Sequence, residues 1–309
     1  MRNHRLRACL RVAVPALLLS LPAAATQAPA GGAQDGARGQ QPAAGAQQGA
    51  RGAQPGGRGA RGARGAAQPA APSKPTPHWP DGRVNLSQAP GIKGFWNVMG
   101  GSPIGTGGSG LPTNLTLAEV PFQDWARELY AYRQSRAGLD DPHARCQPAG
   151  GMRFFTVPNG MEFIDQPELQ RIFIIDGENR DWRRIAMEPG RKHPPEDLLN
   201  PSYFGDSIGH WEGETLVVDT VGFNEKFWFI RGGLPHTRYM HLTERFTRTD
   251  FDTLKYEVTI DDKGAYTRPW NGGWLIKWQY TNYDGSPGGE IHEYFCIDNE
   301  RDAIEFSTQ

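Results

Sequence analysis

Short apolar runs separated by turn residues dominate the chain from Met152 onward. Within most runs apolar and polar residues alternate, which is typical of β-strands with one buried face. We expect strands at Arg153–Val157, Met161–Gln166, Gln170–Ile175, Trp182–Glu188, Ile208–Trp211, Thr215–Val221, Met240–Arg248, Leu254–Asp261, Trp274–Thr281 and Ile291–Ile297. Asn-Gly and Asp-Gly turn dipeptides lie at 159–160, 176–177 and 284–285. Strands and turns without intervening helices predict a mainly β fold, an antiparallel barrel or alternatively a β-sandwich.

One segment has helical periodicity instead. A proline opens Pro121–Tyr132, and proline is favoured in the first turn of a helix. Its large apolar residues recur at helical spacing: Phe122, Trp125, Leu129 and Tyr132. We therefore predict one N-terminal amphipathic helix whose aromatic stripe packs against the barrel or its mouth.

The first 77 residues differ in composition from the rest. Four arginines precede the apolar run Val12–Leu21 and the small residues Ala23–Ala25. This pattern is typical of a secretory signal peptide cleaved near Ala25, with an uncleaved anchor as the alternative. Residues 26–77 are almost wholly Ala, Gly, Gln, Pro and Arg, so we expect a disordered tail before a single β domain at residues 78–309. We expect a periplasmic or secreted protein that is not transmembrane.

The chain has a formal charge of −1, but its charged residues are unevenly distributed along the sequence. Of the 33 basic and 34 acidic residues, ten basic and one acidic lie before residue 78, which leaves the β domain at about −10. An acidic domain argues against nucleic acid as its partner. The Gly-Ala-Arg-Gly repeats of the tail resemble RNA-binding tails, but behind a signal peptide we expect a flexible spacer or weak contact with an anionic envelope surface.

Two cysteines remain after removal of the signal peptide, which contains Cys9. An even number of cysteines in an exported chain favours a disulfide between Cys146 and Cys296. Two buried free thiols are the alternative.

Two sets of residues resemble known families. Gly94-Phe95-Trp96 resembles the opening strand of lipocalin-type barrels, in which the tryptophan closes one end; an ordinary aromatic strand is the alternative. A longer set resembles a widespread family of exported bacterial proteins without an assigned activity, through motifs at 145–148, 205–224, 235–245, 266–270 and 293–296. The first resemblance implies a lipocalin-like barrel around a ligand cavity, and the second implies export.

Gly205-Asp206-Ser207-Ile208-Gly209 matches the nucleophile elbow of α/β-hydrolases. In those enzymes a helix follows the serine, whereas here a hairpin is expected. We interpret the two glycines as a bend at a barrel corner. Asp206 remains a candidate for proton transfer, while Glu212 and Asp219 are interpreted as turn and strand-end carboxylates bonded to backbone.

The predicted strand Met240–Arg248 separates its candidate residues onto two faces. Alternation puts His241 and Arg245 on one face and Glu244 on the other. A metal site built from His236, His241 and Glu244 is therefore not expected, and we predict no metal or cofactor. Glu244 has apolar neighbours on its own face, so we expect it either to pair with a buried arginine or to be an acid of raised pKa in a cavity.

The first functional hypothesis is an exported lipocalin-like protein that binds a small organic or lipid-like ligand. The aromatic load of the C-terminal half and the polar face of the 240–248 strand suggest the ligand-binding residues. These are Trp211, His241, Arg245 and Trp270.

The second hypothesis is an enzyme of the same fold, a cofactor-independent isomerase, hydratase or lyase. His236 and Glu244 are its proton-transfer candidates, supported by His193 and Asp206. His193 and His236 lie in proline-containing loops, which can hold a general acid or base rigidly. A third hypothesis is an envelope-associated structural or interaction protein that acts through its tail.

Overall fold

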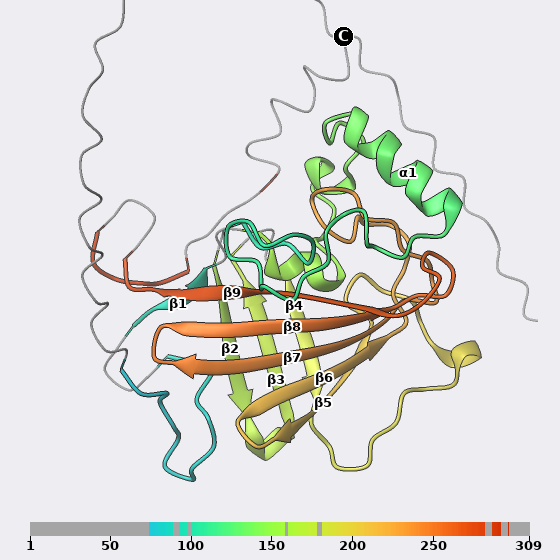
Figure 1. Ribbon diagram of the computed structural model, residues 1–309. Coiled ribbons are helices and arrows are strands. Elements are labelled where there is room, and N and C mark those ends of the chain that lie inside the picture. Colours follow the sequence, from blue (N-terminus) through green and yellow to red (C-terminus); the bar gives the residue numbers. More distant parts are fainter. Residues whose placement is uncertain are drawn as a thin grey trace, which may run out of the picture. The chain divides into compact units, whose positions relative to one another are not determined.

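The structure, a computed structural model, describes residues 74–88, 93–97, 100–157, 160–177, 181–281, 286–291 and 296. The expected signal peptide, the expected tail up to residue 73 and most of the predicted strand Ile291–Ile297 lie outside these residues. The described part is mainly β, and nine strands close into a barrel (Figure 1).

Each strand pairs with the next along the chain, and the last pairs with the first. The strands are β1 Phe95–Asn97, β2 Met161–Gln166, β3 Arg171–Asp176, β4 Trp182–Ala186, β5 Asp206–Glu212, β6 Thr215–Val221, β7 His241–Asp250, β8 Thr253–Asp261 and β9 Trp270–Gln279. The described helices are α1 Asp124–Ser135 and the short 3₁₀ turns η1 Pro142–Arg145, η2 Gly151–Phe155, η3 Pro167–Leu169 and η4 Glu196–Leu198. The prediction of a β-barrel is confirmed, and the sandwich alternative does not apply.

The predicted antiparallel order fails at one place, where β4 and β5 run parallel. Only Ile185 with Ser207 and Ala186 with Ile208 pair across this junction, which we call the seam. A parallel pair needs a long crossover rather than a tight turn, and residues 187–205 supply it. Because the pairing covers only the end of β4 and the start of β5, the beginning of β4 has no strand partner on that side.

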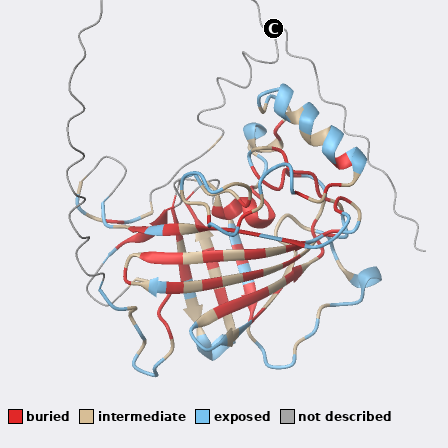
Figure 2. Ribbon diagram, in the orientation of Figure 1, coloured by how far each residue is buried: buried red, intermediate tan, exposed pale blue. Residues whose placement is uncertain are grey.

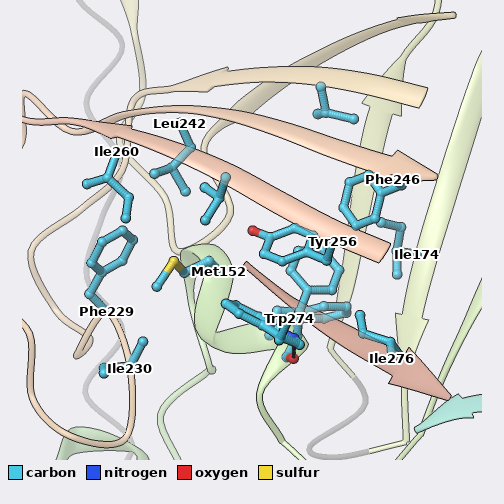
Figure 3. Packing of buried hydrophobic residues seen from close by; sticks show 14 of the residues in the cluster. Met152, Ile174, Phe229, Ile230, Leu242, Phe246, Tyr256, Ile260, Trp274 and Ile276 are labelled. Atoms are coloured by element: carbon cyan, nitrogen blue, oxygen red, sulfur yellow. Dashed lines mark hydrogen bonds between the residues drawn. The ribbon is translucent and has the colours of Figure 1, made fainter. Parts of the chain in front are cut away.

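The centre of the barrel is filled by aromatic side chains. The segment predicted as a strand at Arg153–Val157 instead contains η2, all of whose residues are buried. Gly151 has φ +57°, which turns the backbone out of an extended path. The Phe155 ring then lies 5.2 Å from that of Phe246 and 5.0 Å from that of Tyr256. Figures 2 and 3 show the buried inner faces of the strands and the packing of Tyr256 and Phe246 beside Trp274.

Helix α1 lies outside the barrel wall (Figure 1) and buries little of its surface. Ala126 is its buried residue, while Trp125 is 44% and Tyr132 is 54% exposed. Trp125 still donates through Nε1 to the carbonyl of Gly264, between β8 and β9, at 2.9 Å. The expectation that the aromatic stripe packs against the barrel is therefore wrong for Tyr132. Phe122, which precedes the helix, is buried, and its ring centroid lies 5.5 Å from that of Tyr266. It also stacks on Tyr130 of α1, so Phe122 and Tyr130 make the apolar contact of this segment with the core.

Trp96 of β1 packs beside a buried guanidinium. This side chain is buried, and its Nε1 donates to the carbonyl of Leu86 at 2.7 Å. The guanidinium of Arg248 lies 4.8 Å from its ring centroid and donates to the carbonyl of Asn85 at 2.6 Å. Burial lowers the pKa of Arg248 to about 10, so it remains a cation at neutral pH.

The predicted disulfide is present, since Cys146 and Cys296 are bonded with their Cα atoms 5.5 Å apart. It joins the end of η1 to the C-terminal part of the chain. Among the described helices, none combines the length and the apolar character required to cross a membrane.

Candidate functional site

A buried polar cluster crosses the inner wall of the barrel from β4 to β8. The guanidinium of Arg183 donates through Nη1 to Oε1 of Glu244 at 3.0 Å and through Nη2 to its Oε2. The hydroxyl of Tyr256 donates to the same Oε1 at 2.8 Å, and burial raises its pKa far above the ordinary value. Glu244 is therefore a paired carboxylate, the first of the two alternatives expected from its place in the strand.

Ser207 extends this cluster toward the seam. Its Oγ accepts hydrogen bonds from Nε of Arg183 at 3.0 Å and from the Thr220 hydroxyl at 3.1 Å. In this arrangement the Ser207 hydroxyl hydrogen has no acceptor among the described residues. A hydroxyl has one hydrogen to donate, so Ser207 can still bind an acceptor atom from outside the protein.

The geometry around Ser207 differs from a hydrolase nucleophile elbow. No histidine is among the described hydrogen-bond partners of Ser207, and a hairpin follows it. Gly205 has φ +64°, and a Cβ there would lie 2.4 Å from the carbonyl oxygen of Val221. A Cβ at Gly209 would lie 2.6 Å from the sulfur of Met187. Gly205 thus allows close backbone packing at the seam, and Gly209 leaves room for the side chains of Met187 and Ile185.

A cavity of about 610 Å³ opens at the seam, and we call it the seam cavity. Residues of β3, the start of β4 and the segment 202–207 line it. Arg183 and Ser207 lie on its inner side, and Trp182, which is 57% exposed, also lines it. Arg184 makes no hydrogen bond or ion pair with any described residue. The cavity therefore combines an aromatic surface, two carboxylates, a hydroxyl donor and a cation without an ion pair among the described residues.

Asp206 connects the seam cavity to a second polar cluster on the outer face of the barrel. Its two oxygens are 2.6 Å from Nη2 of Arg191 and 2.7 Å from Nδ1 of His193. Nε2 of His193 lies 3.0 Å from Oδ1 of Asp219, which is 2.7 Å from Nε2 of His241. An ionised carboxylate can only accept hydrogen bonds. His193 therefore donates to Asp206 and to Asp219 together only when both of its ring nitrogens carry a hydrogen.

The outer cluster joins the β4–β5 connection to β6 and β7. Sequence analysis selected His193, Asp206 and His241 separately, and the structure brings them together through Asp219, which was interpreted as structural. The described residues contain no group of three or more His, Cys, Asp or Glu side chains arranged to hold a metal ion.

His236 lies apart from Glu244. It is buried, its Nε2 is 3.0 Å from the carbonyl oxygen of Phe227, and its ring centroid is 4.4 Å from that of Phe227. Burial lowers its pKa, which favours a neutral ring. No described hydrogen bond joins His236 to Glu244, and both oxygens of Glu244 already have partners. The two predicted proton-transfer residues therefore contact different parts of the protein.

The four residues predicted to bind ligand also occupy different environments. Trp211 borders a cavity of about 10 Å³, room for roughly one water molecule. Arg245 pairs with Glu212 on the outer face at 2.8 Å. Trp270 is buried against Tyr266, and His241 belongs to the outer cluster.

Sequence reasoning missed three residues of the seam: Trp182, Arg183 and Arg184. A usable signal was present in the strand Trp182–Ala186. Its alternation places Arg183 on the same face as Ile185, and an arginine on the apolar face of a strand requires buried hydrogen-bond acceptors.

No protein-family model matches the chain, and neither a curated protein nor a solved structure matches it. Function is therefore argued from the geometry of the site.

The outer cluster predicts a dependence of stability on pH. The hydrogen bond that His241 donates to Asp219 raises the pKa of His241 above its ordinary 6.5. Burial alone would raise the pKa of Asp219, but hydrogen bonds from His241 and His193 lower it overall. A histidine whose pKa is raised by folding stabilises the folded state. This stabilisation is fully present below the pKa of the unfolded state, and it is lost as pH rises through the pKa of the folded state.

We expect the urea midpoint of unfolding to fall as pH rises above about 6.5 through the folded-state pKa of His241. His241→Gln should flatten this fall, because glutamine does not titrate. His210→Gln is the control, since His210 is exposed and contacts Glu212 instead. An equally steep fall in His241→Gln and in the unsubstituted protein would contradict the assignment.

Proposed function

We propose that the protein is an exported, lipocalin-like barrel that binds a small organic ligand, and that the ligand binds in the seam cavity. The observation that carries this proposal is a cavity of about 610 Å³ bordered by the Ser207 hydroxyl, which retains a hydrogen to donate. Its volume lies within the range of small-molecule sites. The barrel centre, where the ligand was expected, is occupied by η2 and its aromatic neighbours.

The chemistry of the lining suggests the class of ligand. Ser207 and the cation of Arg184 favour an oxygen acceptor, such as a carboxylate. The exposed ring of Trp182, 5.7 Å from the ring of Phe173, offers a surface for a flat or sugar ring. We therefore propose a ligand that carries both an anionic group and a ring.

Export and the lipocalin type belong to the same proposal. The disulfide supports an oxidising compartment such as the periplasm. The buried Trp96 of β1 supports the lipocalin-like type. The resemblance to the family of exported proteins adds to the case for export, and N-terminal sequencing of the secreted protein tests it: cleavage near Ala25 is expected.

Native mass spectrometry of the full chain, purified after export, tests ligand binding. We expect a co-purifying small molecule, and Trp182→Ala should weaken its binding about tenfold or more because the ring contact is lost. Trp125→Ala is the matched control, since Trp125 is also an exposed tryptophan but lies on α1. A chain without bound ligand from several hosts, or equal effects of the two substitutions, would count against the proposal and favour an interaction protein acting through its tail.

An acid–base enzyme is the second candidate, with different residues from those first selected. Asp206 lines the seam cavity and contacts His193, so this pair could exchange a proton with a bound ligand. His193→Gln is expected to abolish turnover of the identified ligand while leaving its affinity largely intact. Turnover that survives this substitution would exclude His193 from the chemistry.

A further inference from the structure

We propose a second binding site, for an oxyanion carried by a small molecule, between α1 and the β6–β7 connection. A cavity of about 460 Å³ lies there, lined among others by Arg133, Gln134, Asp141, Trp228, Arg231 and Gly232. We call it the helix cavity. None of the residues that line it also lines the seam cavity.

Two guanidinium groups in the helix cavity form no ion pair with any residue that the structure describes. Arg133 donates through Nη1 to the carbonyl of Gly233 at 3.0 Å and lies 4.9 Å from the ring centroid of Trp228, but it forms no ion pair with a described residue. Arg231 is exposed and makes no hydrogen bond or ion pair with any described residue. Burial lowers the pKa of Arg133, which is the electrostatic cost of an unpaired cation in this position.

Asp141 is the acidic residue among those that line the cavity, and it is already neutralised. Its Oδ1 and Oδ2 accept from Nη1 and Nη2 of Arg153 at 2.8 and 2.7 Å, and both side chains are almost fully buried. A carboxylate held in this two-point contact has little capacity left for a second guanidinium. The charge that the helix cavity offers to a ligand is therefore that of Arg133 and Arg231.

This arrangement favours a ligand with two or more anionic oxygens. A partly buried guanidinium without an ion pair is costly, and an oxyanion would offset that cost. The contact with Trp228 and the bond to Gly233 hold Arg133 in place, so little side-chain freedom would be lost on binding. Carboxylate and phosphate groups share the required chemistry, and the volume leaves room for a larger molecule around either.

The disulfide lies next to one wall of the helix cavity. Ala144 lines the cavity from η1, and the residue that caps η1, Cys146, forms the disulfide with Cys296. The cavity is thus built from a helix, a 3₁₀ turn that ends at a disulfide and a loop bonded to Arg133, a concave arrangement of the kind that binds small molecules.

Calorimetric titration of the full chain with succinate, inorganic phosphate and neutral succinamide tests the proposal. We expect succinate or phosphate to bind and succinamide not to bind, and comparison of the two anions distinguishes a carboxylate site from a phosphate site. Arg231→Gln should weaken anion binding about tenfold or more. Arg268→Gln is the matched control, because Arg268 is an exposed arginine outside this cavity, and it should leave affinity unchanged.

Arg133→Gln should weaken binding further but also removes a packing contact, so Arg231→Gln decides the outcome. Equal affinities in Arg231→Gln and Arg268→Gln, equal binding of succinate and succinamide, or no binding of either anion at millimolar concentration would each overturn the proposal. Failure here is distinguishable from failure of the seam proposal, because Trp182→Ala should leave succinate affinity in the helix cavity unchanged.

Discussion

Replacing Glu244 with alanine is expected to lower the free energy of unfolding by about 3–5 kcal/mol. The substitution leaves the buried guanidinium of Arg183 without its carboxylate and removes the acceptor of the Tyr256 hydroxyl. A buried charge that loses its partner is far more costly than the pair itself. Urea unfolding at constant pH, followed by circular dichroism, measures the loss.

Two further variants separate this explanation from a general effect of removing an ion pair. Glu212→Gln breaks the pair with Arg245 on the outer surface, where we expect almost no change in the free energy of unfolding because solvent screens an exposed pair. The double substitution Arg183→Met with Glu244→Leu removes both charges and should recover much of the stability lost in Glu244→Ala. A small effect of Glu244→Ala, or a double variant as unstable as the single one, would contradict a buried, mutually dependent pair.

The alternation of apolar and polar residues predicted most of the barrel strands, because it reflects whether each strand position is buried or exposed. The strand expected at Thr215–Val221 is β6 with the same bounds, and the strand expected at Leu254–Asp261 is β8 extended by one residue. In each strand one face is buried in the barrel and the other meets solvent, so burial leaves a pattern in the sequence. The Cys146–Cys296 bond also followed from the number of cysteines in an exported chain.

Features set by contacts between distant segments were not predictable in this way. Arg153–Val157 has the composition of a strand, but the chain around Gly150 and Gly151 packs on Phe227 and turns the segment into the barrel centre. The parallel pair β4–β5 depends on the path of the 187–205 connection, which contains no β-strand pattern to indicate direction. The seam cavity follows from that path, so the sequence could not locate it.

Some residues of the candidate site were predictable from the sequence, but their arrangement was not. Alternation correctly separated His241 from Glu244, because neighbouring strand positions point to opposite faces. It could not show that Arg183 neutralises Glu244 or that Asp219 joins His193 to His241, since these partners lie far apart in the chain.

Replacing both Cys146 and Cys296 with alanine is expected to lower the free energy of unfolding by up to about 5 kcal/mol. The bond closes a loop of 150 residues, and so long a crosslink strongly restricts the unfolded chain. Chemical unfolding of the oxidised protein and of the double variant measures the difference. Cys9→Ala is the control and should have no effect, because Cys9 lies in the expected signal peptide.

The same double variant tests whether the disulfide also braces the helix cavity. Cys146 directly follows η1, so its release should loosen the wall that contains Ala144 and weaken succinate binding, while ligand binding in the seam cavity should change little. A loss of stability below about 1 kcal/mol would mean that residual structure in the unfolded chain already restricts the loop. If stability falls strongly but succinate affinity does not change, the disulfide stabilises the fold without shaping the helix cavity. Arg133 and Arg231 are then positioned by the helix and the β6–β7 connection.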